Sequence, residues 1–219
     1  MLNYQTLVYV HILLMVFWIG TDIGVFIAGL HFMNPTLPLE QRRAAIGVGM
    51  IIDRYPRICF AAMLPVGAQL AWLRGLLVVS TLTMVILWLA CIVWMAAVVS
   101  GMVLAGTPRA APWQRIERLF QLAGVILIGG WGVALLASDS AVPGWLAGKM
   151  ISFGLICLFA MLLEHAFQPV LAAFTAISAS GSTSALETQL RRGMYWTYLW
   201  VLAIYAGVLV AGFLGTVKP

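Results

Sequence analysis

The sequence predicts an all-α fold, a polytopic transmembrane bundle of about six helices that forms a single domain over residues 1–219. Of its 219 residues, 63% are hydrophobic and only 9% are charged, whereas about a quarter are charged in soluble proteins. Apolar segments near the roughly 20 residues that cross a hydrocarbon core follow one another along the chain. Little sequence remains between them for a soluble domain. The segments are centred on 4–30, 46–73, 76–105, 117–138, 145–174 and 192–216.

Local signals define the ends of these segments. The first has no basic stretch and no small-residue cleavage site before it, so we expect a retained helix rather than a signal peptide. Two prolines in "MNPTLPLEQRR" (33–43) should end that helix before the next one begins. The small residues of "GVILIGGWG" (124–132) should let the fourth segment approach a neighbour closely. We expect "SASGSTSALETQLRRG" (178–193) to be a loop before the last helix.

The basic residues predict the orientation. Nine of the twelve lie around the first, third and fifth connections, and three lie on the opposite side. By the positive-inside rule this places both termini in the periplasm, in a multi-pass protein of a bacterial inner membrane. Topology thus explains the net charge of +5, and nucleic acid is not an expected partner. The nine are Arg42, Arg43, Arg54, Arg57, Arg109, Arg115, Arg118, Arg191 and Arg192, and the three are Arg74, Lys149 and Lys218.

The first segment carries polar residues on one face. His11, Trp18 and Asp22 are separated by 7 and 4 residues, which places Trp18 and Asp22 each within about 20° of His11 on one helix face at 100° per residue. Ionisable groups at membrane depth normally face the bundle interior. Either both groups hydrogen-bond to neighbouring helices, or His11 binds a metal or haem. In the second case Asp22 would support the histidine or relay protons.

Topology arranges the remaining candidates in two layers. Near the outer surface it pairs His11 with Lys149, and near the inner surface it pairs His31 with His165. The inner pair is the only pair of histidines expected at one depth. Two histidines on facing helices are typical axial ligands of a low-spin b-type haem.

Two arginines share the expected level of the inner layer. Counting about twenty residues back from Arg74 places Arg54 and Arg57 at the inner membrane boundary. Their guanidinium groups could clamp the carboxylates of a porphyrin. Alternatively they extend to lipid headgroups, with Asp53 and Arg57 forming an i, i+4 ion pair.

Two short stretches resemble one known family. "HILLMVFWIG" (11–20), a histidine followed seven residues later by tryptophan, and "GWLAGKM" (144–150) resemble signatures of the HemJ/CopD-like membrane proteins. The resemblance to HemJ-type members implies haem b at His11, and protoporphyrinogen oxidation that depends on His11 and Lys149. The CopD-type members imply copper uptake instead. This sequence departs from HemJ-type proteins in having about six segments rather than four, and in lacking an arginine in "TDIGVFIAGLHF" (21–32).

The sequence therefore predicts an integral membrane redox protein that binds one or two haems b. It would transfer electrons, or act as a haem-dependent oxidoreductase on a lipophilic substrate such as a quinone or a porphyrinogen. Copper transport across the inner membrane and a purely structural membrane subunit stay open as alternatives. Expected partners are membrane lipid and the lipophilic substrate, with a homo-oligomer or a redox partner left open. The candidate residues are His11, His31 and His165 as metal ligands, Arg54, Arg57 and Trp18 around the cofactor, and Lys149 and Asp22 as catalytic residues.

Overall fold

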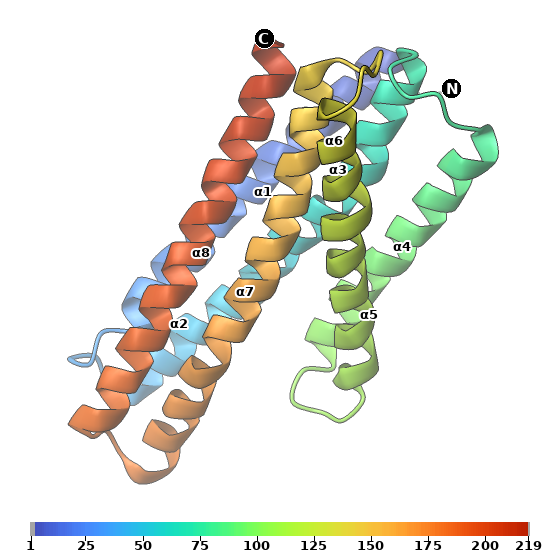
Figure 1. Cartoon of the computed structure of the whole chain (residues 1–219). Coiled ribbons are helices and arrows are strands. Elements are labelled where there is room, and N and C mark those ends of the chain that lie inside the picture. The colour runs from blue at the N-terminus through green and yellow to red at the C-terminus, as the bar shows by residue number, and fades with distance from the viewer. Residues whose placement is uncertain (1–2, 219) are drawn as a thin grey trace. The chain divides into compact units, whose positions relative to one another are not determined.

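The computed structural model describes residues 3–218, which form helices and contain no strand. Six helical stretches are long and apolar enough to cross a membrane, so the chain is a multi-pass membrane protein and the predicted fold class is confirmed. The second stretch combines α2 and α3, and the fourth combines α5, η1 and α6. The helices are α1 (Tyr4–Phe32), α2 (Leu39–Ile52), α3 (Arg54–Leu73), α4 (Thr81–Val103), α5 (Ala110–Ala123), η1 (Gly124–Gly129), α6 (Gly130–Leu136), α7 (Gly144–Ser180) and α8 (Ser184–Val217) (Figure 1).

The expected loop over 178–193 is wrong. Only residues 181–183 lie outside a helix there, because α7 continues to Ser180 and α8 begins at Ser184. Gly181 leaves the helix with a φ of +91°, and the Thr183 side chain caps α8 by accepting from the Leu186 amide. The polar residues of this stretch therefore belong to the ends of two long helices.

The second apolar stretch begins earlier than the sequence indicated. Helix formation starts at Leu39 rather than near residue 46, directly after the turn that Pro35 and Pro38 introduce. The stretch divides at Asp53, which precedes α3. Pro56 lies in the first turn of α3, where the missing amide hydrogen costs no helical hydrogen bond.

The described residues group into two compact units. Unit 1 holds residues 3–27 and 47–120, and unit 2 holds residues 28–46 and 121–218. Unit 1 therefore contains most of α1, the end of α2, all of α3 and α4, and most of α5. Unit 2 contains the end of α1, the start of α2, the end of α5, and the chain from η1 to α8.

Helices α7 and α8 run side by side and form the centre of unit 2 (Figure 1). Toward their connection they pack against the end of α1 and the start of α2. Arg42 is only 2% exposed there, and its Nε donates to the Phe32 carbonyl at 2.9 Å. Its other nitrogens donate to both carboxylate oxygens of Glu187, at 2.7 and 3.0 Å. The apolar cluster around this ion pair consists of Phe32, Val170, Ala173, Phe174, Ile177, Leu190 and Met194.

Glycines hold η1 and α6 in close contact with α7, as the small residues of 124–132 predicted. A Cβ added at Gly154 would lie 2.6 Å from the Gly129 Cα. A Cβ at Gly132 would lie 2.8 Å from the Ala147 carbonyl oxygen. The backbones therefore meet without intervening side chains.

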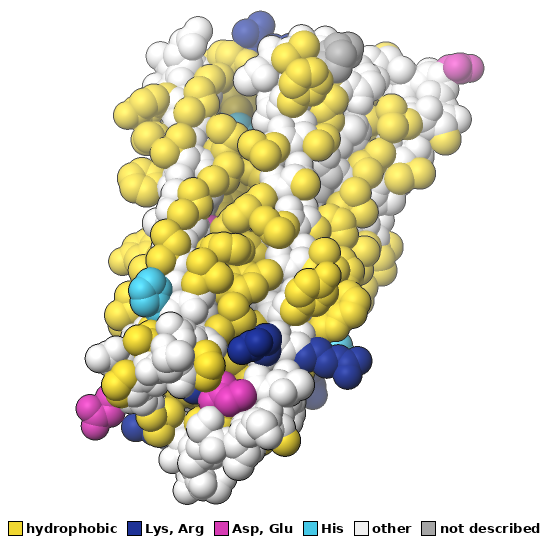
Figure 2. All heavy atoms as spheres, turned by 90° about the vertical axis from the view of Figure 1, so that its left-hand side faces the viewer, with side chains coloured by type: hydrophobic (Ala, Val, Ile, Leu, Met, Phe, Trp, Pro, Cys, Tyr) yellow, Lys and Arg dark blue, Asp and Glu magenta, His cyan; other side chains and the backbone are white. Residues whose placement is uncertain are grey.

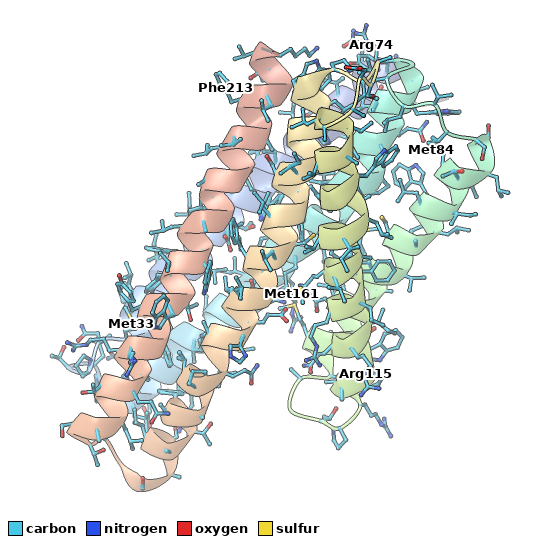
Figure 3. All side chains as sticks on the ribbon, in the orientation of Figure 1. Met33, Arg74, Met84, Arg115, Met161 and Phe213 are labelled. Atoms are coloured by element: carbon cyan, nitrogen blue, oxygen red, sulfur yellow. The ribbon has the colours of Figure 1, made fainter. Side chains whose placement is uncertain are left out.

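The outward faces are apolar, as membrane lipid requires. Figure 2 shows hydrophobic side chains over the middle of the visible face and charged side chains mostly toward one end. Phe213 on α8 is 56% exposed and points away from α7 (Figure 3). Leu209 on the same helix is 66% exposed. Exposure of this kind suits helices that contact hydrocarbon rather than water.

Candidate functional site

The candidate site lies in unit 1, whose polar and aromatic side chains form successive layers. At one end of α3 the Arg74 guanidinium lies over the Tyr4 ring, 4.2 Å from its centroid. Figure 3 shows Arg74 at one end of this unit and Arg115 at the other. The cation and the aromatic ring join the beginning of α1 to the end of α3.

His11 occupies the next layer. Two turns along α1 from Tyr4, its imidazole lies against α3 at Gly67, where an added Cβ would be 3.3 Å from the His11 Cε1. The Nδ1 atom is buried. Any side chain larger than hydrogen at position 67 would press on the ring, so the glycine determines where the imidazole can lie.

Four aromatic rings form the third layer. Trp18, only 6% exposed, contacts Phe60 at 4.9 Å between centroids. Phe60 contacts Trp94 edge-on at 5.3 Å, and Trp94 stacks on Phe120 at 5.5 Å with planes 3° apart. This aromatic layer crosses α1, α3, α4 and α5 at distances typical of favourable ring pairs.

Charged side chains form the fourth layer, about one helical turn beyond the rings. The Arg57 Nε donates to Asp53 at 2.8 Å, which confirms the predicted i, i+4 pair. Its Nη1 donates to Glu117 at 3.1 Å, so the guanidinium joins α3 to α5. Glu117 is 6% exposed. Sequence reasoning missed Glu117, although it precedes Phe120 by one turn and therefore shares its face.

Asp22 lies at the level of this charged layer. Its position follows from the contacts on either side of it: Trp18 meets Phe60, and Gly24 faces Ile52. Because α1 is one continuous helix, Asp22 is about 16 Å along its axis from His11. Asp22 therefore cannot support the imidazole by a hydrogen bond; a hydrogen bond to a neighbouring helix and a proton-relay role are both compatible with this position.

Arg54 lies beside the same layer, at the first position of α3. Its Nε is buried and has no hydrogen-bond partner among residues 3–218. However, Arg54 is 13 residues from Gly67, or about 20 Å along the axis, whereas Arg74 is about 10 Å from it. Of the three arginines, Arg74 therefore lies nearest to the level of His11 along the α3 axis, whereas Arg57, at about 15 Å, and Arg54 lie farther away.

The other predicted site residues lie in unit 2. His31 near the end of α1 and His165 on α7 both have exposed side chains, so the described chain encloses neither imidazole. Lys149 is partly buried on α7 against Gly215 of α8. Among residues 3–218, no group of three or more His, Cys, Asp and Glu side chains could hold a metal ion.

The layers of unit 1 fit the requirements of a haem in part. The chain offers one imidazole against Gly67, an apolar aromatic wall and a cation at one end of the unit. A bound b-type haem would be held by His11, with Arg74 beside its acidic substituents. Comparisons with protein-family models, curated proteins and solved structures find no match.

Proposed function

We propose that this protein is a membrane redox protein that binds b-type haem with His11 as an axial ligand. The observation that carries the proposal is the position of the imidazole, fixed against Gly67 and one layer from the rings that begin at Trp18. The resemblance of residues 11–20 and 144–150 to HemJ/CopD-like proteins supports the same assignment of His11. Lys149 is the catalytic lysine that this resemblance would imply.

Haem would supply one-electron chemistry at this position. The His11 imidazole would hold the iron, and Arg74 would neutralise acidic groups at the membrane boundary. The aromatic layer from Trp18 to Phe120 excludes water and provides closely packed rings between α1 and α5. Beyond it, we assign the proton relay to Asp22, at the level of the Arg57 ion pairs. A lipophilic electron carrier such as a quinone, or a porphyrinogen, is the substrate class that suits an apolar, lipid-exposed bundle.

The first experiment is an absorbance spectrum of the purified protein in mild detergent, oxidised and then reduced with dithionite, with a pyridine haemochrome assay. We expect a b-type signal near one haem per chain. His11→Ala should remove most of that signal, because the aromatic layer alone supplies no ligand to iron. His31→Ala and His165→Ala are matched controls, since both change a histidine with an exposed side chain.

The histidine variants also separate the alternatives. Loss of the signal in His31→Ala or His165→Ala, with His11→Ala unchanged, would move the haem to the inner layer and refute the assignment to His11. A colourless protein from cells with ample haem would refute the haem proposal altogether. Copper analysis of the same preparation would then separate a copper transporter from a structural subunit.

We further propose a bacterial inner membrane with both termini in the periplasm. The arginines around the first, third and fifth connections support this orientation. In cells, a cysteine at Val78, which is 98% exposed, should react with a membrane-impermeant maleimide added to the periplasmic side. A cysteine at Ala179 should react only after the membrane is opened. The opposite labelling would invert the topology.

A further inference from the structure

The ammonium group of Lys149 lies along α8 instead of extending into solvent. A Cβ added at Gly215 would be 2.6 Å from the Lys149 Nζ, 3.5 Å from its Cε and 3.7 Å from its Cδ. The distal half of the side chain therefore occupies the space that a glycine leaves open on α8. Figure 1 shows the beginning of α7 beside the end of α8, so both residues lie near one end of unit 2.

A second ammonium group belongs to the same place. Lys218 follows the last turn of α8, and its Nζ lies 5.6 Å from the centroid of the Trp145 ring. Trp145 is one turn before Lys149 on α7. The Trp145 ring thus places the charge of Lys218 near the end of α7 that carries Lys149. Neither forms an ion pair or a hydrogen bond with any residue between 3 and 218.

The helix ends do not neutralise this charge. The end of α8 carries a partial charge of about −0.5, and the beginning of α7 carries about +0.5. These partial charges cancel where the two ends lie together, so the helix ends supply no net negative charge to the two ammonium groups. An ammonium that is partly buried in a membrane bundle is costly unless an anion accompanies it. The structure thus contains a cationic site with no protein anion described beside it.

We propose that Lys149 and Lys218 bind an anionic oxygen group of a membrane amphiphile, either the phosphate of a phospholipid or the carboxylate of a lipophilic acid. Lys149 is five residues from the beginning of α7, about 7.5 Å along the axis, so the two lysines lie at the end of the span rather than at its centre. Trp145 contributes the amphipathic ring that is typical of the membrane interface. The site is independent of the proposed haem, which lies in unit 1.

Gly215 is the positioning residue of this site. An alanine there would meet only the flexible end of the Lys149 side chain, so Gly215→Ala should displace the ammonium and leave the helices in place. Gly130→Ala is the matched control, because an added Cβ at that position has no atom within 4 Å. Lys149→Gln removes the charge itself.

The test uses the purified full chain in a neutral detergent. Binding is measured by native mass spectrometry and by the shift in thermal unfolding midpoint, with dioleoylphosphatidylglycerol, dioleoylphosphatidylcholine or oleate added at equal mole fraction. We expect phosphatidylglycerol or oleate to bind and to raise the midpoint, and phosphatidylcholine to have little effect. In Gly215→Ala and Lys149→Gln the affinity should fall roughly tenfold or more, as expected for one lost charge-assisted contact. Gly130→Ala should bind as the unchanged protein does.

The outcomes distinguish the two sources of the anion. Variant-sensitive binding of phosphatidylglycerol alone supports a phospholipid phosphate, and variant-sensitive binding of oleate alone supports a carboxylate. Binding of both supports a general anion site. Equal effects of phosphatidylglycerol and phosphatidylcholine, no binding of either acid lipid, or unchanged affinity in both variants would overturn the proposal, whatever the haem spectrum shows.

Discussion

Gly154→Ala should destabilise the protein because α7 touches η1 through its backbone at this position. The added Cβ would lie 2.6 Å from the Gly129 Cα and 3.1 Å from the Gly129 nitrogen. Carbon atoms in contact normally lie about 3.5–4.0 Å apart, so the two helices must separate by roughly 1 Å. Neither contact atom belongs to a side chain that could rotate away. The whole η1–α7 contact must therefore loosen.

The expected cost follows from two opposing effects. Overpacking of this kind typically costs about 1–3 kcal/mol. Replacing a helical glycine with alanine returns up to about 1 kcal/mol. We therefore expect Gly154→Ala to lower the free energy of unfolding by about 1–2 kcal/mol. Gly130→Ala has the helix-propensity gain without the clash, and should be neutral or slightly stabilising.

The assay is reversible unfolding in mixed micelles, followed by circular dichroism, with both variants measured in one detergent. A lower stability for Gly154→Ala alone is the predicted result. Equal stabilities of the two variants would show that η1 and α7 do not meet at Gly129 and Gly154 as described. A loss in both variants would instead point to a general need for glycine in this span.

Two further predictions concern the ion pairs. Arg42→Ala should lower the free energy of unfolding by about 2–3 kcal/mol, because it leaves the partly buried carboxylate of Glu187 without its bidentate partner. Chemical unfolding measures this loss, with Arg43→Ala, a change at an exposed neighbour, as the control. Equal losses in the two variants would contradict the prediction. Glu117→Gln should cost less, about 1–2 kcal/mol, because Arg57 keeps its ion pair with Asp53. If Glu117→Gln destabilised the protein as much as Arg42→Ala does, the ion pair of Arg57 with Asp53 would not compensate for the lost ion pair with Glu117.

The helical spans could be predicted because lipid leaves few alternatives to a continuous apolar helix. What could not be predicted was the extension of α7 and α8 to residues 180 and 184. Serine, threonine and charged residues in this stretch resemble a loop in composition. In the structure, Ile177 and Leu190 bury their side chains in the cluster of unit 2, and this packing holds the surrounding polar residues in helices.

The fourth span shows a different limit. Small residues predicted a close approach, but a period of 100° per residue places Gly124 and Gly129 about 140° apart. The π-helical turn of η1 brings residues five apart nearly above one another, so that both glycines face α7, at Cys157 and Gly154 respectively. No residue type by itself predicts a π-helical turn. The contact was therefore predictable, and the backbone geometry that makes it was not.

In the candidate site, the spacing of His11, Trp18 and Asp22 along α1 was more informative than the types of these residues. On α1, Trp18 follows His11 by seven residues. On α3, which runs antiparallel, His11 contacts Gly67 and Trp18 contacts Phe60, and these two positions are also seven residues apart. Glycine and phenylalanine carry no polar signal, so these partners could not be recognised before the register was known. The same register places Asp22 beside the Arg57 network rather than beside His11.

This separation has a mechanistic consequence for the proposed redox function. In the proposed mechanism, the haem ligand His11 and the proton relay Asp22 are about 16 Å apart along α1. The aromatic layer occupies the interval, and its rings Trp18 and Trp94 are only 6% and 2% exposed. Coupling between the two groups must therefore act through charge, which a low-dielectric interior transmits over longer distances than water does. On this reasoning a change in the charged layer, such as Glu117→Gln, should shift the midpoint potential of a haem at His11 while leaving its absorbance spectrum intact.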